Sequence, residues 1–206
     1  MKGYAIAAGA AIAALLAGTW WVTLARPTDD AFAACRTSVI AGGAGAIGGP
    51  FTLVNGAGQS VTEAQVFTKP SLVYFGYTFC PDVCPLDNAR NADAIDALTE
   101  RGYDVQPVFI SIDPERDTPE VVGEFAGYMH EKMIGLTGSI EQVTAASKAY
   151  KTYFRKQDSD DPDYYLVDHS TFTYLVLPQT GFVEFFKRGD TVEDIAERTA
   201  CFVDAA

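Results

Sequence analysis

The hydrophobic and polar positions divide the chain into an uncharged N-terminal segment and a longer part in which apolar runs alternate with amphipathic stretches. Residues 4–25 contain no charged side chain and consist mostly of Ala, Ile, Leu, Val and Trp. As a helix, this segment would be about 33 Å long, which is enough to cross the hydrocarbon core of a bilayer. We therefore predict a transmembrane anchor over residues 4–25, preceded by a short cytoplasmic N-terminus over residues 1–3.

The charges that flank residues 4–25 suggest its orientation. Lys2 and the amino terminus precede it, and Trp20 and Trp21 lie near its far end, as interfacial anchors do. We expect a single-pass protein of the bacterial inner membrane, with the following domain in the periplasm. A cleaved signal peptide is the competing interpretation, but the apolar run is long for one. The Ala-Phe-Ala at 31–33 also lies beyond a proline and two acids, which is a poor cleavage context.

A linker is predicted over residues 26–50, with a glycine-rich end at 41–50. This end contains Gly-Ala-Gly-Ala-Ile-Gly, which matches a dinucleotide-binding fingerprint letter for letter. In that fingerprint the glycines follow a strand and open a helix. Here a glycine, a proline and the strand-like residues 51–54 follow instead, so the match does not indicate nucleotide binding.

The rest of the chain, residues 51–206, reads as one domain in which strand-like and helix-like patterns alternate. The predicted elements are a hairpin at 51–66, strands at 71–77, 105–112 and 133–136, helices at 85–100, 119–131 and 139–150, a second hairpin at 171–187 and a closing helix at 191–203. Residues 157–163 are polar and acidic and read as an exposed insertion. This order predicts an α/β sandwich with a mixed central sheet, for which a thioredoxin-like architecture is the natural candidate.

Composition narrows the range of partners and raises the question of disulfides. The formal net charge is −12 and Lys and Arg form no cluster, so the sequence argues against nucleic-acid binding. The chain has four cysteines, and disulfides become feasible if the domain lies outside the membrane in an oxidising compartment. Cys35 and Cys201 could then join the incoming chain to the last helix, although spacing alone does not fix the pairing.

The candidate chemistry lies in the Cys-Pro-Asp-Val-Cys run that follows the strand at 71–77. Both Cys80 and Cys84 fall between a strand end and a helix N-terminus, where the helix dipole favours the thiolate over the thiol. Pro85 suits a first helical position, so we expect Cys84 to cap the helix. Thiolate is the form that attacks disulfides and the form that binds soft metals, so this pair alone leaves redox chemistry and metal binding open.

Of the two histidines, His169 has the more informative setting. His130 falls at the end of a helix and reads as a surface residue, whereas His169 lies immediately before the hairpin strand that begins at 171. In a thioredoxin-like fold, the loop that enters this strand faces the Cys motif. Disulfide oxidoreductases of that fold normally carry a cis-proline there, but residues 168–171 contain no proline. Two thiolates and one imidazole form a soft, low-coordination set that suits copper(I) or zinc.

Three motifs together resemble the signatures of the Sco/SenC family. They are Phe-Gly-Tyr-Thr-Phe-Cys-Pro-Asp-Val-Cys-Pro at 75–85, Ser-Ile-Asp-Pro-Glu-Arg-Asp-Thr-Pro at 111–119 and Val-Asp-His-Ser at 167–170. The resemblance runs from about residue 47 to 202. It implies a membrane-anchored, thioredoxin-like copper protein that helps to build the binuclear copper centre of cytochrome c oxidase. Carried over to this chain, Cys80, Cys84 and His169 would be the copper ligands. A bridge between Cys35 and Cys201 is not part of the family's general pattern.

From these observations we predict a copper metallochaperone that delivers copper to the copper-bearing subunit of cytochrome c oxidase, with another copper chaperone as a candidate donor. Asp82 and Asp168 are expected to orient the ligands without binding directly. The alternative is an enzyme, a thiol-disulfide oxidoreductase in which Cys80 and Cys84 reduce the oxidase's copper-ligand cysteines. A redox or copper sensor is a third interpretation, for which the sequence offers no separate support. The acidic loop at 113–120 reads as a helix start beside the Cys motif and not as a catalytic acid pair.

Overall fold

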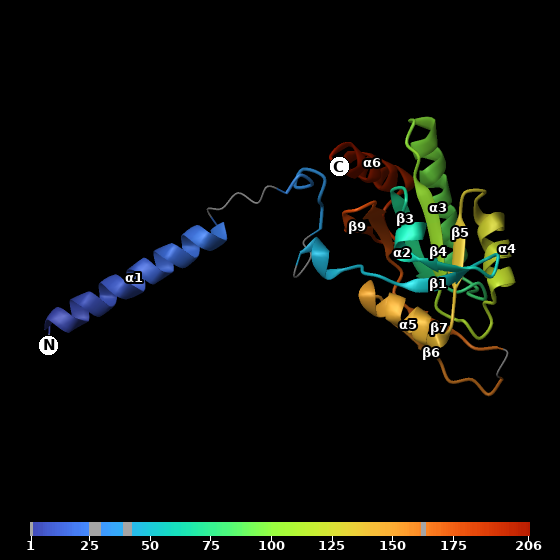
Figure 1. Ribbon diagram of the computed structural model, residues 1–206, viewed down its shortest axis with the longest axis horizontal. Coiled ribbons are helices and arrows are strands. Elements are labelled where there is room, and N and C mark those ends of the chain that lie inside the picture. Colours follow the sequence, from blue (N-terminus) through green and yellow to red (C-terminus); the bar gives the residue numbers. More distant parts are fainter. Residues whose placement is uncertain (1, 25–29, 39–42, 162–163) are drawn as a thin grey trace. The chain divides into compact units, whose positions relative to one another are not determined.

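A computed structural model describes residues 2–24, 30–38, 43–161 and 164–206, and it divides the chain into two compact units. The first unit, Met1–Ala33, contains the helix α1 (Lys2–Leu24) (Figure 1). In the part of the chain that the structure describes, no helix has both the length and the apolar character that a bilayer crossing needs. The transmembrane anchor over residues 4–25 therefore stays a prediction.

The second unit, Ala34–Ala206, is built on a mixed seven-stranded sheet with the order β2-β1-β5-β4-β3-β8-β9. The three central strands β5, β4 and β3 are parallel, and the neighbours on both sides are antiparallel. The strands of this sheet are β1 (Thr52–Asn55), β2 (Ser60–Thr62), β3 (Ser71–Gly76), β4 (Gln106–Ser111), β5 (Ile134–Thr137), β8 (Thr173–Leu177) and β9 (Gly181–Phe186). This architecture confirms the predicted α/β sandwich with a mixed, thioredoxin-like sheet.

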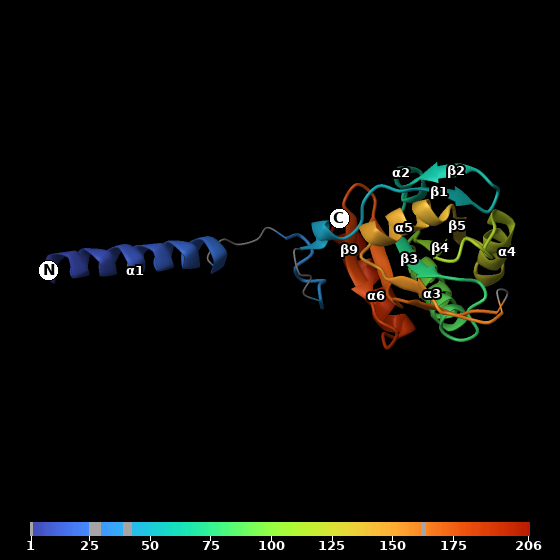
Figure 2. The ribbon, with the colours of Figure 1, turned by 90° about the horizontal axis from the view of Figure 1, so that it is seen from below.

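Helices cover both faces of this sheet, as the all-buried pattern of β3 requires. Side chains alternate between the faces along a strand. Tyr74 of β3 points to one face, where its hydroxyl donates a hydrogen bond to the carboxylate of Asp87 in α3. Phe75 points to the other face and packs against Tyr150 at the end of α5. Helices α3 and α6 pack against each other (Figure 2). The helices of this unit are α2 (Glu63–Val66), α3 (Val83–Glu100), α4 (Pro119–Met129), α5 (Ile140–Ala149) and α6 (Val192–Asp204), with a 3-10 turn η1 (Ala44–Ala46).

The start of the second unit is tied to the sheet and to α6 by several contacts. Cys35 and Cys201 form a disulfide, so the bridge that the sequence left open is present. Next to it, the Arg36 guanidinium donates to the carbonyl oxygen of Val183 at 2.5 Å, and the Thr37 amide donates to the buried carboxylate of Glu184. These contacts place residues 35–37 against β9 and α6.

The sequence patterns did not predict two parts of the fold: the short helix α2, which lies within the residues predicted as a hairpin at 51–66, and a second, two-stranded sheet. This sheet consists of β6 (Phe154–Lys156) and β7 (Val167–His169), paired antiparallel so that Phe154 lies opposite His169. The predicted acidic insertion at 157–163 lies between these strands, and the structure describes it except for 162–163. We call β6 and β7 with their connection the β6–β7 hairpin, or the hairpin for short. It carries His169 at the end of a strand, where the sequence suggested a loop.

Candidate metal centre

The Cys motif forms the connection between β3 and α3. Cys84 is the second residue of α3 and is fully buried, and Cys80 lies just before the helix with 8% of its surface exposed. The helix begins at Val83 with Asp82 as its N-cap, so the prediction that Cys84 caps the helix is wrong by two residues. Pro85 then stands within the first turn, where its missing N–H leaves no helical hydrogen bond unmade.

A glycine at the end of β3 makes room for the buried sulfur. A Cβ atom on Gly76 would lie 3.0 Å from Cys84 Sγ and 2.8 Å from a ring carbon of Tyr74, so a larger residue would displace the sulfur or the ring. The Cys84 amide in turn donates to Cys80 Sγ at 3.4 Å. Backbone geometry thus brings both sulfurs to one side of the helix N-terminus.

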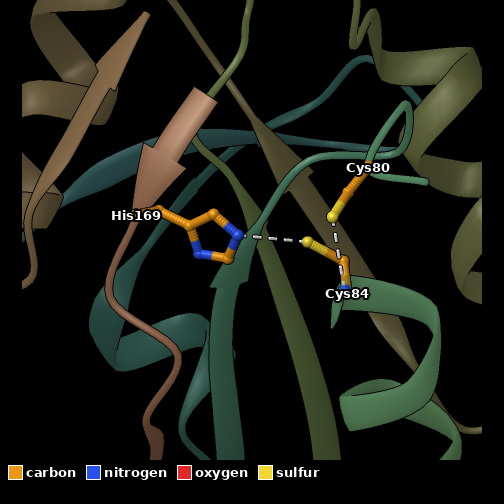
Figure 3. Close-up of side chains that lie close together, drawn as sticks. All are labelled: Cys80, Cys84 and His169. Atoms are coloured by element: carbon orange, nitrogen blue, oxygen red, sulfur yellow. Dashed lines mark hydrogen bonds between the residues drawn. The ribbon is translucent and has the colours of Figure 1, made fainter. Parts of the chain in front are cut away.

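His169 reaches this corner from the separate hairpin. Its Nε2 lies 3.4 Å from Cys84 Sγ (Figure 3), and its Nδ1 lies 2.9 Å from the carbonyl oxygen of Ser170. A carbonyl oxygen only accepts hydrogen bonds, so Nδ1 carries the ring hydrogen and Nε2 faces the sulfurs with its lone pair. The rings of Tyr74 and Tyr77 meet the imidazole edge-to-face, at centroid distances of 6.2 and 5.8 Å.

These three side chains are close enough to share one ion. Their ligand atoms all lie within 4.8 Å of one another, and they are the one such group of His, Cys, Asp or Glu among the described residues. Metal–sulfur bonds of about 2.3 Å would bring two sulfurs to roughly 4 Å apart, so only a small closure is needed. Two thiolates and a neutral imidazole fit a soft cation such as copper(I) or zinc and leave its coordination unsaturated.

Hydrogen bonds give the two sulfurs different protonation states in the reduced protein. The hydrogen bond from Cys84 lowers the pKa of Cys80, helped by the backbone amides of Asp82 and Cys84. The same bond, together with burial, raises the pKa of Cys84. Cys80 is thus the thiolate of the pair and Cys84 the thiol, so loading a metal requires Cys84 to release its proton.

Asp117 holds the Cys loop in place, and the sequence patterns missed this role. Its carboxylate accepts hydrogen bonds from the Thr78 amide at 3.0 Å, from the Thr78 hydroxyl at 2.5 Å and from the Ser111 hydroxyl at 2.5 Å. The carboxylate is fully buried, and this burial raises its pKa. The following helix α4 is capped by Thr118. The signal for this role was the acidic loop after a buried strand, which the sequence placed correctly beside the Cys motif.

The other predicted residues lie near the site or away from it. The Asp168 carboxylate accepts hydrogen bonds from Gln157 at 2.6 Å and Arg155 at 3.1 Å, so it ties the hairpin together next to His169. Asp82 is exposed, and its backbone amide contacts Cys80. His130 caps the end of α4 and pairs with Asp96 at 3.2 Å, so it takes no part in the sulfur site.

Comparisons with known proteins agree with this geometry. The SCO1/SenC family model matches residues 41–204. Protein SenC of Rhodobacter capsulatus is 53% identical over 205 residues, which cover 99% of this chain and 91% of that protein. The mitochondrial SCO1 homolog 1 of Arabidopsis thaliana is 45% identical over 156 residues, which cover 75% of this chain but only 46% of that longer protein.

Solved structures show the same fold. The crystal structure of Arabidopsis thaliana ScoI with copper bound superposes with a TM-score of 0.73 at 43% identity, covering 77% of this chain and 99% of that one. A structure of BsSco, described as having a disulfide switch and as a member of the Sco family of cytochrome c oxidase assembly proteins, superposes with a TM-score of 0.56. It covers 74% of this chain and 92% of that one, and at 24% identity it supports the fold alone.

Proposed function

The chain belongs to the SCO1/SenC family, and we propose that it is a copper metallochaperone of cytochrome c oxidase assembly. The single observation that carries this proposal is the convergence of Cys80, Cys84 and His169 within 4.8 Å. Copper is the cargo, held by the two sulfurs and by His169 Nε2. A related protein with copper bound, at 43% identity, supports this choice over zinc.

The chain's own groups explain how such a cargo could be received and released. Cys80 is already a thiolate, and the Ser170 carbonyl keeps the lone pair of His169 Nε2 directed at the sulfurs. Only Cys84 has to lose a proton on loading. Three protein ligands leave coordination positions open, so an incoming thiolate of an acceptor protein can bind before a resident ligand leaves. Cys80 is the more exposed sulfur and the first that an acceptor would reach.

We also propose the partners and the location that this role requires. The acceptor is the copper-bearing subunit of cytochrome c oxidase, and another copper chaperone is a candidate donor. The disulfide between Cys35 and Cys201 supports an oxidising compartment such as the periplasm. The uncharged residues 4–25 support an N-terminal inner-membrane anchor.

A thiol-disulfide oxidoreductase is the second candidate, favoured by the stabilised thiolate of Cys80 beside a second free thiol. In that reaction, the Cys80 thiolate attacks a disulfide of the acceptor and forms a mixed disulfide. Cys84 then loses its proton and attacks Cys80 Sγ, which releases the acceptor as a dithiol. The acceptor gains the two electrons that the Cys80–Cys84 pair loses.

Replacing His169 with Ala separates the two candidates. We expect His169→Ala to lower copper(I) affinity by at least about 100-fold in a competition titration with a chromophoric chelator, since a direct ligand is lost. Dithiol–disulfide exchange should persist. His130→Ala, at the end of α4, is the matched control and should bind copper as the wild type does.

Transfer itself needs a second measurement. The reduced, copper-loaded wild-type protein should pass copper to the apo form of the oxidase subunit, and the oxidised protein should take up no copper, because a disulfide offers no thiolate. If His169→Ala retained full copper affinity, the ligand assignment would be wrong. Reduction of the subunit's cysteines without any copper transfer would instead favour the oxidoreductase.

A further inference from the structure

The guanidinium of Arg116 contacts both segments that carry the sulfur and imidazole ligands. Its Cζ lies 3.5 Å from the ring centroid of Tyr165 and 4.9 Å from that of Phe79. Tyr165 stands four residues before His169, and Phe79 stands directly before Cys80. Arg116 itself belongs to the loop between β4 and α4. One side chain thus joins three segments that are far apart in the sequence.

The surroundings of Arg116 hold it in this position. Its Nε donates to the Asp113 carboxylate at 2.6 Å, and the Tyr165 hydroxyl donates to the other oxygen of the same carboxylate at 2.6 Å. Asp113 is buried, and the Arg116 side chain is only 12% exposed. A cation over an aromatic ring gains more when water is excluded, so this buried stack is stronger than a surface one. Because Arg is planar, it can stack on a ring and bind a carboxylate at once, which Lys does less well.

The hairpin has few other attachments to the Cys loop among the described residues. The Val167 amide donates to the Tyr77 hydroxyl at 3.3 Å, and the imidazole of His169 meets the Tyr77 ring. Both contacts are made by residues that follow Tyr165 in the sequence, on the side of the hairpin that leads to the metal site. The stack on Arg116 is therefore placed where it can set how closely β7 approaches the sulfurs.

We propose that Arg116 is a positioning residue for the copper site, which docks the hairpin that carries His169 onto the Cys loop through the rings of Tyr165 and Phe79. This inference rests on the proposed function only in taking copper as the bound metal. Among the described residues, no contact joins Arg116 to either sulfur or to the imidazole. It acts by keeping His169 Nε2 within reach of Cys84.

The main test compares Arg116→Met with Arg116→Lys in the full-length reduced protein, with copper(I) as the probe. Arg116→Met keeps the apolar stem and loses the cation, and we expect copper affinity to fall about 10- to 100-fold, as when an outer-sphere partner is removed. Arg116→Lys keeps a cation near the rings but cannot stack and bind Asp113 at once as well as Arg does, so its loss should be smaller than that of Arg116→Met without being absent. Arg101→Met removes an exposed partner of Glu193 at the far end of α3 and should leave the affinity unchanged.

Two further readouts distinguish positioning from a general structural role. In the metal-free protein, hydrogen exchange at the Val167 amide should become at least about tenfold faster in Arg116→Met, while amides in the centre of β3 keep their rates. In a His169→Ala background, Arg116→Met should have no further effect on residual copper affinity, because the imidazole that it positions is gone.

Each outcome bears on the proposal. Wild-type copper affinity in Arg116→Met together with unchanged Val167 exchange would overturn it. Equal losses with and without His169 would show that Arg116 acts through overall stability and would overturn it as well. A wild-type protein that binds copper but fails to transfer it would contradict the proposed function and leave this inference standing.

Discussion

The two cysteine pairs of this protein share a residue type and differ in everything that determines reactivity. Cys80 and Cys84 are close in sequence, remain free thiols and face an imidazole. Cys35 and Cys201 are 166 residues apart and form a disulfide with a Cα–Cα distance of 5.7 Å. Around the first pair, hydrogen-bond donors converge on one sulfur and favour the thiolate. Around the second, Arg36 and Thr37 tie the chain to β9, and the disulfide itself ties it to α6.

This difference shows that the surroundings, and not the sulfur itself, assign a cysteine to chemistry or to stability. A stabilised thiolate makes the reduced form of Cys80 and Cys84 more favourable, so their disulfide is more easily reduced. The Cys35–Cys201 bridge instead constrains the unfolded chain across a long loop. We therefore expect substitutions in the two pairs to affect different properties of the protein.

The largest expected effect is the loss of metal binding on substitution of Cys84. Cys84→Ala removes one of two thiolates, and we expect stoichiometric copper(I) binding to disappear, with a loss of affinity above the roughly 100-fold limit for outer-sphere changes. The matched variant Cys35→Ala/Cys201→Ala should bind one copper with wild-type affinity. Titration against a chromophoric chelator measures both. A disulfide variant that lost copper as completely as Cys84→Ala would remove the functional distinction between the pairs.

The second effect concerns stability, and here the Cys35–Cys201 pair matters more than the Cys80–Cys84 pair. Removing the bridge with Cys35→Ala/Cys201→Ala should lower the free energy of unfolding by about 2–5 kcal/mol, as expected for a cross-link over a long loop. Urea unfolding followed by far-ultraviolet circular dichroism is the appropriate measurement, because both tryptophans lie in α1 and do not report on the second unit.

The control for this stability measurement is Cys80→Ser. Cys80 lies at the edge of the core, so its replacement should change the free energy of unfolding by less than about 1 kcal/mol. Equal destabilisation by the two variants would contradict a structural role specific to the bridge.

The smallest effect is a change in the pH dependence of Cys80 reactivity. Because hydrogen bonds from the Cys84 side chain and from the backbone amides of Asp82 and Cys84 lower its pKa, Cys80 stays a thiolate at pH values below the pKa of an ordinary thiol. Its alkylation by iodoacetamide in the reduced, metal-free protein should therefore vary less than about twofold between pH 6 and 8, whereas an ordinary thiol gains about tenfold per pH unit.

Mass spectrometry of the Cys80 peptide measures this rate, and Cys84→Ala, which removes the main hydrogen bond to the Cys80 sulfur, should restore part of the pH dependence. Cys84, which is fully buried and has a raised pKa, should remain unmodified. A tenfold rise per pH unit at Cys80 in the wild type would show that its thiolate is not stabilised.

Local sequence patterns predicted the elements with strong periodicity or composition. The buried strand that became β3, the amphipathic helix α5 and the closing helix α6 lie within two residues of their predicted bounds. The small sheet of β6 and β7 was missed, since three-residue strands carry no measurable period. The start of α3 was misplaced because a proline usually marks the first turn, whereas here the helix begins two residues before Pro85.

Some residues of the candidate site could likewise be predicted from local sequence patterns, and others could not. Residue types and spacing identified Cys80, Cys84 and His169, because a thiol pair at a strand–helix junction and an imidazole before a hairpin have recognisable surroundings. Asp117 and Arg116 lay in a motif that the sequence singled out, but their partners come from other segments. Thr78 contacts Asp117 from the Cys loop, and Tyr165 contacts Arg116 from the far hairpin.

The order of strands and helices, the nature of the donor atoms and the acidity of the chain follow from the residues in their order along the chain, since each depends on neighbours within a few positions. The folded structure alone decided that His169 Nε2 lies 3.4 Å from Cys84 Sγ and that Cys35 pairs with Cys201. Both depend on how the sheet and its helices bring distant segments together. Such long-range contacts arise from packing many side chains at once, and no local pattern encodes them.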